Sequence, residues 1–342
     1  MSQNECLSPT RRTLLAAGAA ALPAALTGGL GLLPGHAGAQ EGDYPSHPIT
    51  MVVPFAPGGA TDVPARIIQQ KLGEVLGQQI VVDNRDGANG IVGLGQVQRS
   101  KPDGYTIALT NVGSMAVNEH IYSSMPFKPL TDFQAVSMVC DIPGVVVASN
   151  KFPPNNVTEL IAYIKKNPGK VTFASPGVGS VNRLQVEELA LSQGLDLVHV
   201  PYKGGAGPMP DLIAGRIDFM FLALATALTH LKGGRIKALG SSTRARLPQL
   251  PNVPTLAEQG FPKNVTSSWQ GIFVPSATPA PIVRRLHEAI VRTVNDPTVQ
   301  TAMAEAGLLP QTSASPKEFQ DFVAADSAKW GDVVRRAHVT AN

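Results

Sequence analysis

Short apolar runs alternate with amphipathic stretches along the chain after its first forty residues, and this alternation limits the fold more than any other feature. An apolar run of about four to eight residues bounded by turn residues is typical of a buried strand, whereas an apolar period of about 3.6 residues is typical of a helix. Strands that alternate with helices predict an α/β fold whose parallel sheets carry helices on both faces. The strand-like runs are ITMVVPF (49–55), QIVVDN (79–84), YTIALT (105–110), VVVAS (145–149), VTFAS (171–175), LVHVP (197–201), IDFMFL (217–222), IKALGS (236–241) and SWQGIFVP (268–275), and helices are expected near 62–76, 90–100, 157–167, 181–193, 206–215 and 281–295.

The length and the apolar content of the chain suit two domains. Its 342 residues, 43% of them hydrophobic, can form two buried cores. No linker rich in proline or serine divides the chain, so we expect it to cross between domains near 141–150 and to return near 267–275. The expected domains are lobe I, residues 40–144 plus 271–342, and lobe II, residues 145–270.

The first forty residues have a different composition from the rest. The segment TRRTLL (10–15) precedes an uncharged stretch rich in alanine and glycine, and AGA (37–39) fits a small-residue cleavage site. The pair Arg11–Arg12 is typical of a twin-arginine export signal. Proline and glycine within the stretch make a membrane anchor the weaker alternative. We therefore expect residues 1–39 to be a signal peptide that is cleaved after Ala39, with the mature chain in the periplasm.

The charge and the motif content exclude several functional classes. The formal net charge is +3, and KK (165–166) and RR (284–285) are isolated pairs, so no nucleic-acid partner is expected. The sequence contains no G-x-S-x-G elbow, no P-loop and no G-x-G-x-x-G fingerprint. Its histidines lack metal-ligand spacing, and Cys140 is the one cysteine after the signal segment. We expect a protein that is not an enzyme, with no catalytic residue, no metal and no cofactor.

Four junctions between a strand-like run and a helix-like stretch are rich in small residues. They are PFAPGGATD (54–62), TNVGSM (110–115), ASPGVGSVN (174–182) and PYKGGAGPMPD (201–211). Ligands bind at such junctions of open parallel sheets, where bare backbone N–H groups and helix N-termini can face an anion. Because four similar junctions occur, we predict that they converge on one anion-binding cleft.

The polar side chains at these junctions also have structural explanations. Thr61, Ser114 and Ser180 add hydroxyl groups, although capping of the following helix is the more common role for each. Asp62 and Arg66 are four residues apart at a helix start, where a pair that fixes the loop is the expected arrangement. Asp218 lies within the apolar run RIDFMFL, where a buried carboxylate needs a structural partner.

Several longer segments together resemble one receptor family. They are VPFAPGGATDVPARIIQQKLGEVLGQQIVVDNRDGANGIVG (53–93), KPDGYTIAL (101–109), ASPGVGS (174–180), VPYKGGAGPMPDLIAGRIDFMF (200–221), LPNVPTLAEQGFP (250–262) and WQGIFVPSATP (269–279). This set resembles the Bug, or tripartite tricarboxylate transporter, substrate-binding receptors. The resemblance implies a type II periplasmic binding-protein fold: two Rossmann-like lobes, a two-strand hinge and a ligand cleft between the lobes.

The resemblance also implies a ligand site. One ligand carboxylate would be held by the loop 55–62 and by the loop 175–180, partly through water. The Gly58–Gly59 turn would present neutral N–H donors, so no buried cation is left unpaired when the cleft is empty. The residues at the other junctions, together with Val181 and Leu224, are expected to line the cleft, either as part of its wall or as contacts of the ligand. The candidate ligand-binding residues are Phe55, Ala56, Pro57, Gly58, Gly59, Ala60, Thr61, Asp62, Val112, Gly113, Ser114, Ser175, Gly177, Val178, Gly179, Ser180, Asn182, Arg183, Tyr202, Gly205, Ala206 and Ala223.

One candidate departs from the family pattern. The segment GVGSVNRL places Arg183 where the family often has a histidine. A guanidinium at this position can bind a second ligand carboxylate bidentately. It can equally pair with Glu187, its i+4 neighbour. Both alternatives stay open from the sequence.

The leading hypothesis is therefore a periplasmic receptor for a small organic carboxylate: a di- or tricarboxylate, an acidic amino acid or an aromatic acid. It would deliver this ligand to the membrane subunits of a tripartite tricarboxylate-type transporter. The alternatives are an exported enzyme that acts on a carboxylated substrate in the same cleft, and a ligand sensor that acts through a sensor protein without transport. A monomer is expected.

Overall fold

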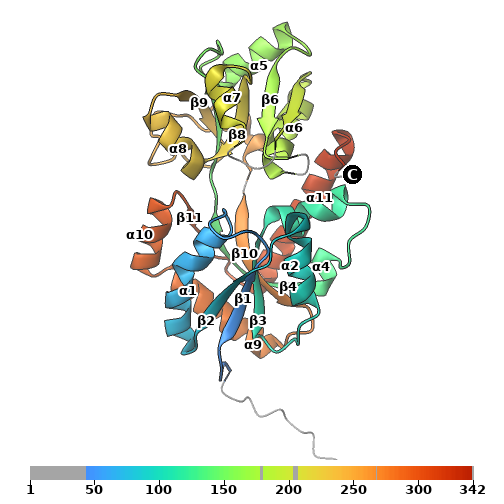
Figure 1. Ribbon diagram of the computed structural model, residues 1–342, viewed down its shortest axis with the longest axis vertical. Coiled ribbons are helices and arrows are strands. Elements are labelled where there is room, and N and C mark those ends of the chain that lie inside the picture. Colours follow the sequence, from blue (N-terminus) through green and yellow to red (C-terminus); the bar gives the residue numbers. More distant parts are fainter. Residues whose placement is uncertain (1–43, 178–179, 203–206, 267, 341–342) are drawn as a thin grey trace, which may run out of the picture. The chain divides into compact units, whose positions relative to one another are not determined.

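A computed structural model of the chain describes residues 44–340 apart from 178–179, 203–206 and 267. In this part of the chain the strands form two sheets, one of six strands and one of five (Figure 1). All the runs predicted as strands are strands, with ends that differ by one or two residues. No helix among the described residues is both long enough and apolar enough to cross a membrane.

The six-stranded sheet follows the order β11-β4-β10-β3-β1-β2. Its first three strands along the chain are parallel to one another, and β10 runs antiparallel to both of its neighbours. One apolar cluster lies under α1 (Asp62–Leu76), α9 (Ala280–Val294) and α10 (Pro297–Glu305), and a second lies under α2 (Ile91–Gln98) and α11 (Pro316–Arg336). The strands are β1 (Ile49–Val53), β2 (Ile80–Asn84), β3 (Thr106–Asn111), β4 (Phe133–Asp141), β10 (Trp269–Pro275) and β11 (Leu309–Pro310), and the short helices are η1 (Ala88–Gly90), η2 (Gly113–Val117), α3 (Asn118–Ile121) and α4 (Pro129–Asp132).

The five-stranded sheet follows the order β7-β6-β8-β5-β9. Its β6, β7 and β8 are parallel, and β5 runs antiparallel to both of its neighbours. Helices α5 and α6 bury one face of the sheet, and α7 and α8 bury the other. The elements are β5 (Gly144–Ser149), α5 (Val157–Lys166), β6 (Thr172–Ser175), α6 (Val181–Gln193), β7 (Val198–Pro201), α7 (Met209–Ala214), β8 (Phe219–Ala223), α8 (Leu224–Lys232), β9 (Ile236–Ser241) and η3 (Pro262–Asn264).

The prediction of purely parallel sheets was wrong. A helical crossover forces two strands of one sheet to be parallel, but neither β5 nor β10 follows such a crossover within its own sheet. Only Ile142 and Pro143 separate β4 from β5, so the chain runs directly from one sheet into the other. The strands that enter a sheet from the other sheet are β5 and β10, and each of them runs antiparallel to its neighbours.

Hydrogen bonds join the two segments that connect the sheets. The backbone N–H of Ile142 donates to the carbonyl of Ser268 (3.3 Å), and the N–H of Ser268 donates to Oδ1 of Asp141 (2.7 Å). Further on, the N–H of Ser242 donates to the carbonyl of Gly144 (2.9 Å). The two connections therefore lie side by side. The lobe limits expected from the sequence, 40–144 plus 271–342 and 145–270, stay a prediction.

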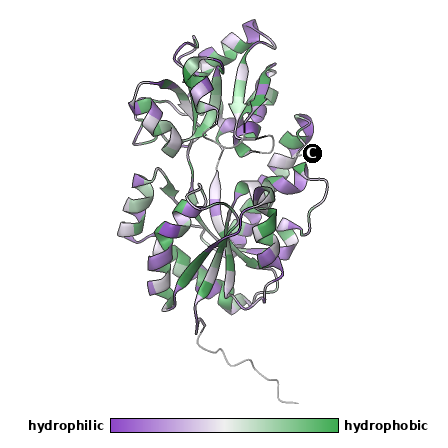
Figure 2. Cartoon of the chain, viewed as in Figure 1, coloured by the Kyte–Doolittle hydropathy of each residue, from purple (hydrophilic) through white to green (hydrophobic). Residues whose placement is uncertain are grey.

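The helices begin and end where their sequences favour it. The Ser315 hydroxyl accepts from the N–H of Glu318 (3.1 Å) and so caps α11, while the Glu318 side chain accepts from the N–H of Ala314 (2.6 Å) just before the cap. Helix α1 ends at Gly77, which adopts a left-handed conformation with φ of +75°. Hydropathy follows the layers, with hydrophobic strands and helices that carry both kinds of residue (Figure 2). The packed helices and strands hold the ends of the sheets, where the loops begin, in place.

Candidate ligand-binding site

The loop between β1 and α1 is folded onto itself by its two glycines. Gly58 has a φ of +76°, which favours glycine, and its N–H donates to Oδ2 of Asp62 (2.8 Å). The N–H of Gly59 donates to the carbonyl of Ala56 (3.2 Å), so close that a Cβ on Gly59 would lie 3.1 Å from that oxygen. Both glycine N–H groups thus donate within the loop in this conformation, and anion binding by this turn stays a prediction. Pro57 and Ala60 remain exposed, as do Ala56 and Gly58.

Asp62 holds this loop in place. Its side chain is 6% exposed, and its Oδ1 accepts from Nδ2 of Asn84 (2.9 Å) and from Nε of Arg66 (3.2 Å). Burial alone would raise the pKa of Asp62, but the hydrogen bonds from Gly58 and Asn84 and the Arg66 guanidinium hold it below its usual value. Asn84 also donates to the carbonyl of Phe55 (3.0 Å). The loop-fixing role expected for the Asp62–Arg66 pair is confirmed.

The loop after β3 is tied to the first loop through Asn111. Nδ2 of Asn111 donates to the hydroxyl of Thr61 (3.2 Å), and its Oδ1 accepts from the N–H of Ser114 (3.1 Å). The Ser114 hydroxyl, which is fully buried, donates to the carbonyl of Asn89 (3.1 Å). Neither Thr61 nor Ser114 caps a helix with its side chain. Thr61, which is 2% exposed, is thus joined to the loop after β3 through Asn111.

The loop after β6 is centred on Ser175. Its buried hydroxyl lies 2.7 Å from Nε2 of His199 and 2.9 Å from the carbonyl of Gly177. The Ser180 hydroxyl donates to the same carbonyl (2.8 Å) and accepts from the N–H of Arg183 (3.3 Å), so the capping role holds for Ser180. Ser180 therefore fixes the loop to the start of α6.

His199 was missed by the sequence analysis. It stacks on Phe173, with ring centroids 4.9 Å apart, and burial, with a smaller contribution from the charge of Arg183, lowers the pKa of His199 to about 4. The ring is therefore neutral at neutral pH and gives Ser175 a fixed partner. No hydrogen bond joins a carboxylate to His199 in the described part of the chain, so the Ser175–His199 pair lacks the third group of a nucleophilic triad.

Arg183 pairs with its helix neighbour. Its Nε donates to Oε1 of Glu187 at 3.1 Å, and the Arg183 side chain is 13% exposed. The i+4 pair is thus present, and contact of Arg183 with a ligand carboxylate stays a prediction. Nearby, Nδ2 of Asn182 donates to the carbonyl of Phe221 (3.2 Å). Arg183 is therefore held by its own helix, α6, and Asn182 is held by strand β8.

Two other candidates have structural partners. The Tyr202 hydroxyl donates to Oδ2 of Asp211 (2.5 Å), and burial followed by this bond raises the pKa of Tyr202 to about 12. Asp218 accepts from the N–H (2.7 Å) and from the hydroxyl (2.9 Å) of Thr172, so its structural pairing is confirmed. Ala223 ends β8 and packs against the apolar cluster of the six-stranded sheet. The candidates Val178, Gly179, Gly205 and Ala206 lie outside the described residues.

Loops from the two sheets approach each other. Cγ2 of Val181, at the start of α6, lies 3.8 Å from the position that a Cβ on Gly113 would take. Val112 and Gly113 are themselves buried. The structure thus brings the loops after β1, β3 and β6 into contact through Thr61, Asn111 and Val181. It contains no cluster of metal-binding side chains among the residues that it describes.

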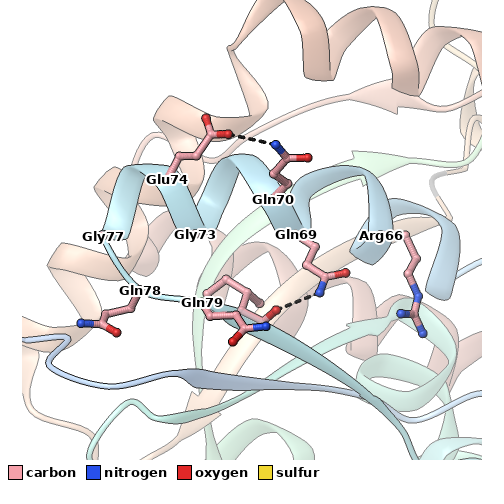
Figure 3. Close-up of a pocket in the computed structure, with 9 residues that line it drawn as sticks. Arg66, Gln69, Gln70, Gly73, Glu74, Gly77, Gln78 and Gln79 are labelled. Carbon is pink, nitrogen blue, oxygen red and sulfur yellow. Dashed lines mark hydrogen bonds between the residues drawn. The ribbon is translucent and has the colours of Figure 1, made fainter.

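A surface depression of about 760 Å³ lies elsewhere, beside α1 and β2. Two of its polar side chains have partners within it: Nε2 of Gln69 donates to the carbonyl of Ile80 (2.8 Å), and Nε2 of Gln70 donates to Glu74 (3.2 Å) (Figure 3). It shares no residue with the loops after β3 and β6. We do not assign the ligand to it.

Comparisons with known proteins agree with this arrangement. Residues 64–339 match the model of the tripartite tricarboxylate transporter family receptor. The solved periplasmic binding protein BugD is 35% identical, with a TM-score of 0.72 over 87% of this chain and 99% of BugD. A Rhodopseudomonas palustris protein solved with adipate is 32% identical (TM-score 0.76; 87% of this chain, 99% of the other), and MatC from the same organism, solved with malate, is 30% identical (0.72; 85% and 100%).

The fold predicted from the sequence is therefore confirmed. The two sheets with their helices form the two Rossmann-like lobes of a type II periplasmic binding protein, and the segments around residues 142 and 268 form the two-strand hinge of the cleft. The family match covers most of the chain. The chain belongs to the tripartite tricarboxylate transporter receptors, the family that includes the Bug proteins.

Proposed function

We propose that the protein is a periplasmic receptor that captures a small dicarboxylate in the cleft and delivers it to the membrane subunits of a tripartite tricarboxylate-type transporter. The observation that carries this proposal is the loop 55–62, which is fixed by Asp62 and Asn84 while Ala56, Pro57 and Ala60 stay exposed. A loop that is rigid before binding loses little conformational entropy when a ligand binds.

The electrostatics of the loops favour an anion. The loop 55–62 leads into the 15-residue helix α1, and Ser180 leads into the 13-residue helix α6. The N-termini of both helices carry partial positive charge. The Asp62 charge is offset by Arg66 and by the N–H of Gly58, so it repels an incoming carboxylate little.

The relatives indicate the class of the ligand. Two of the solved proteins hold adipate and malate, which both carry two carboxylates. A dicarboxylate can place one carboxylate between the loops 55–62 and 175–180, with its second carboxylate farther along the cleft. Because the ligand then contacts both lobes only when they are closed, its binding favours closure. Export through residues 1–39 and a monomeric state are parts of the same proposal.

The test is calorimetric titration of the exported protein with adipate, malate, glutamate and benzoate, followed by analysis of the recovered ligand. Binding of a dicarboxylate that is recovered unchanged supports the receptor. Conversion of the ligand would favour the alternative of an enzyme. If none of the four acids binds to protein that was unfolded, freed of ligand and refolded, the proposal is refuted. Uptake by cells that lack the receptor gene then separates transport from sensing, because only a transport role predicts that uptake is lost.

A further inference from the structure

The five-stranded sheet has two ends, and the cleft loops lie at only one of them. The loop after β6 begins at Ser175, and β5 enters the sheet from the hinge at Gly144. The opposite end carries the segment that follows β5 and the turns that lead into β6, β7, β8 and β9. Helix α5 lies beyond this opposite end (Figure 1). A surface there is separated from the cleft loops by the length of the strands.

Hydrogen bonds join the segments at this opposite end to one another. Nδ2 of Asn150, directly after β5, donates to a carbonyl in the turn before β9 (2.7 Å). Nζ of Lys151 donates to the carbonyl at the end of α7 (2.8 Å), and the N–H of Gly169 donates to the carbonyl of Asp196 in the turn before β7 (3.2 Å). These segments, far apart in the sequence, therefore form one continuous surface.

This surface carries the excess positive charge of the chain. Its segments, 150–172, 194–198, 211–218 and 232–237, contain eight lysine and arginine residues and four acidic residues. In the rest of residues 44–342, 18 basic residues balance 18 acidic ones. We call the surface the basic tip and define it by the six basic residues that are exposed and form no ion pair with another described residue. They are Lys151, Lys165, Lys166, Lys170, Lys232 and Arg235.

Helix dipoles account for only part of this arrangement. Lys165 and Lys166 lie in the last turn of α5, and Lys232 ends α8, where a cation offsets the partial negative charge of the helix C-terminus. Lys170 and Arg235 lie in turns outside any helix. The basic tip thus has more positive charge than its helices require, and this charge is available to attract an anionic partner.

The composition of the basic tip favours a charged lipid surface over a protein as this partner. Protein interfaces have an apolar core, and lysine is depleted in them. The exposed large hydrophobic side chains of the described residues are Val81, Val92, Val198 and Phe322, and of these only Val198 belongs to the segments of the tip. Five of the six basic residues are lysines. Their compact, strongly hydrated charges suit attraction to anionic lipid without insertion.

We propose that the basic tip binds the surface of a membrane that contains anionic phospholipids. This proposal rests on the proposed function, because a periplasmic receptor shares its compartment with the membrane that holds the transporter. Attraction between exposed charges extends only about 10 Å at 0.1 M salt, so the tip and not the whole lobe meets the membrane. The cleft loops lie at the other end of the sheet, and a receptor bound in this way can still take up its ligand.

The experiment is sedimentation of the exported protein with vesicles at low ionic strength. One set of vesicles contains phosphatidylglycerol and phosphatidylcholine in equal amounts, and the other contains phosphatidylcholine alone. We expect binding to the mixed vesicles only, and release in about 1 M salt, where charges are screened within about 3 Å. The triple variant Lys165→Gln/Lys166→Gln/Lys170→Gln should bind the mixed vesicles at least tenfold more weakly without a change in Tm.

The matched control removes three exposed positive charges from the other lobe, in Lys101→Gln/Lys128→Gln/Arg284→Gln. It changes the net charge by the same amount and should bind the mixed vesicles as the wild type does. Equal loss of binding in both triple variants would show that net charge alone attracts the protein, and it would refute the basic tip. Absence of binding to the mixed vesicles, or equal binding to both kinds of vesicle, would refute it as well.

Titration with a dicarboxylate separates this proposal from the proposed function. The tip variant should bind the dicarboxylate with the affinity of the wild type, because the tip shares no residue with the loops 55–62 and 175–180. Vesicle binding without any dicarboxylate binding would refute the receptor and leave the membrane contact in place. Dicarboxylate binding without vesicle binding would refute the membrane contact alone.

Discussion

Replacing Asp62 by alanine tests whether the loop 55–62 is held ready for a ligand. The carboxylate accepts hydrogen bonds from the N–H of Gly58, from Asn84 and from Arg66. Hydrogen bonds to a charged group contribute about 1.5–3 kcal/mol each. The Arg66 side chain is 47% exposed, so its share is small. Because water can replace part of what the other two donors lose, we expect the free energy of unfolding to fall by roughly 2–4 kcal/mol.

The same substitution should weaken ligand binding. Without Asp62, the backbone around Gly58 must be ordered by the ligand, and ordering one residue costs about 1–2 kcal/mol. A dissociation constant about tenfold higher is therefore expected, since about 1.4 kcal/mol corresponds to a factor of ten.

The assay combines thermal unfolding with calorimetric titration of a dicarboxylate that binds the wild type. A loss of 2–4 kcal/mol corresponds to a fall in Tm of roughly 5–10 °C in a chain of this size. The control is Asp321→Ala, which removes an exposed i,i+4 pair with Lys317 of the same chemical type and should change neither Tm nor affinity measurably. A variant with lowered Tm but unchanged affinity would refute the role of the loop in binding.

Three further changes have defined outcomes. The folded-state pKa of His199, about 4, is lower than its usual value near 6.5, so the His199 contribution to stability is complete above pH 6.5 and is lost as the pH falls towards 4. Urea titrations at several pH values should show that the free energy of unfolding of His199→Gln falls less over this pH range than that of the wild type. In Gly271→Ala the new methyl group would overlap the Phe319 ring beside β10, and urea denaturation should show a loss of about 1–3 kcal/mol, unless Phe319→Leu is added to make room. Arg183→Gln breaks the pair between Nε of Arg183 and Glu187 and should change dicarboxylate affinity in titrations by less than threefold; a loss of a hundredfold would show that Arg183 binds the ligand.

Much of the fold could be predicted because its signals are local. Each short apolar run flanked by turn residues is a strand, and α1 and α6 have the predicted limits. The missed helix α8 begins at Leu224 directly after β8, so one apolar stretch contains both elements and periodicity cannot divide it. Strand β4 was missed because Gln134 and Ser137 interrupt its apolar run. Helix α11 was missed because most of its surface is polar.

The site could be predicted only where partners are close in sequence. The i+4 spacing suggested both Asp62–Arg66 and Arg183–Glu187, and both pairs are present. The contact between Ser175 and His199 depends on β6 and β7 being neighbours in the sheet, which no local pattern reveals. Asn84 reaches Asp62 for the same reason, since it lies at the end of β2 beside β1.

The positions of the tryptophans should make the intrinsic fluorescence of this receptor sensitive to its conformation. The chain contains two tryptophans, and both Trp269 and Trp330 are fully buried. Trp269 begins the strand that returns from the hinge, and its indole N–H donates to Asp326 of α11 (2.8 Å). Indole emission depends on the polarity and the charge near the ring. Rotation of the lobes about the hinge should therefore change the fluorescence of the unlabelled protein.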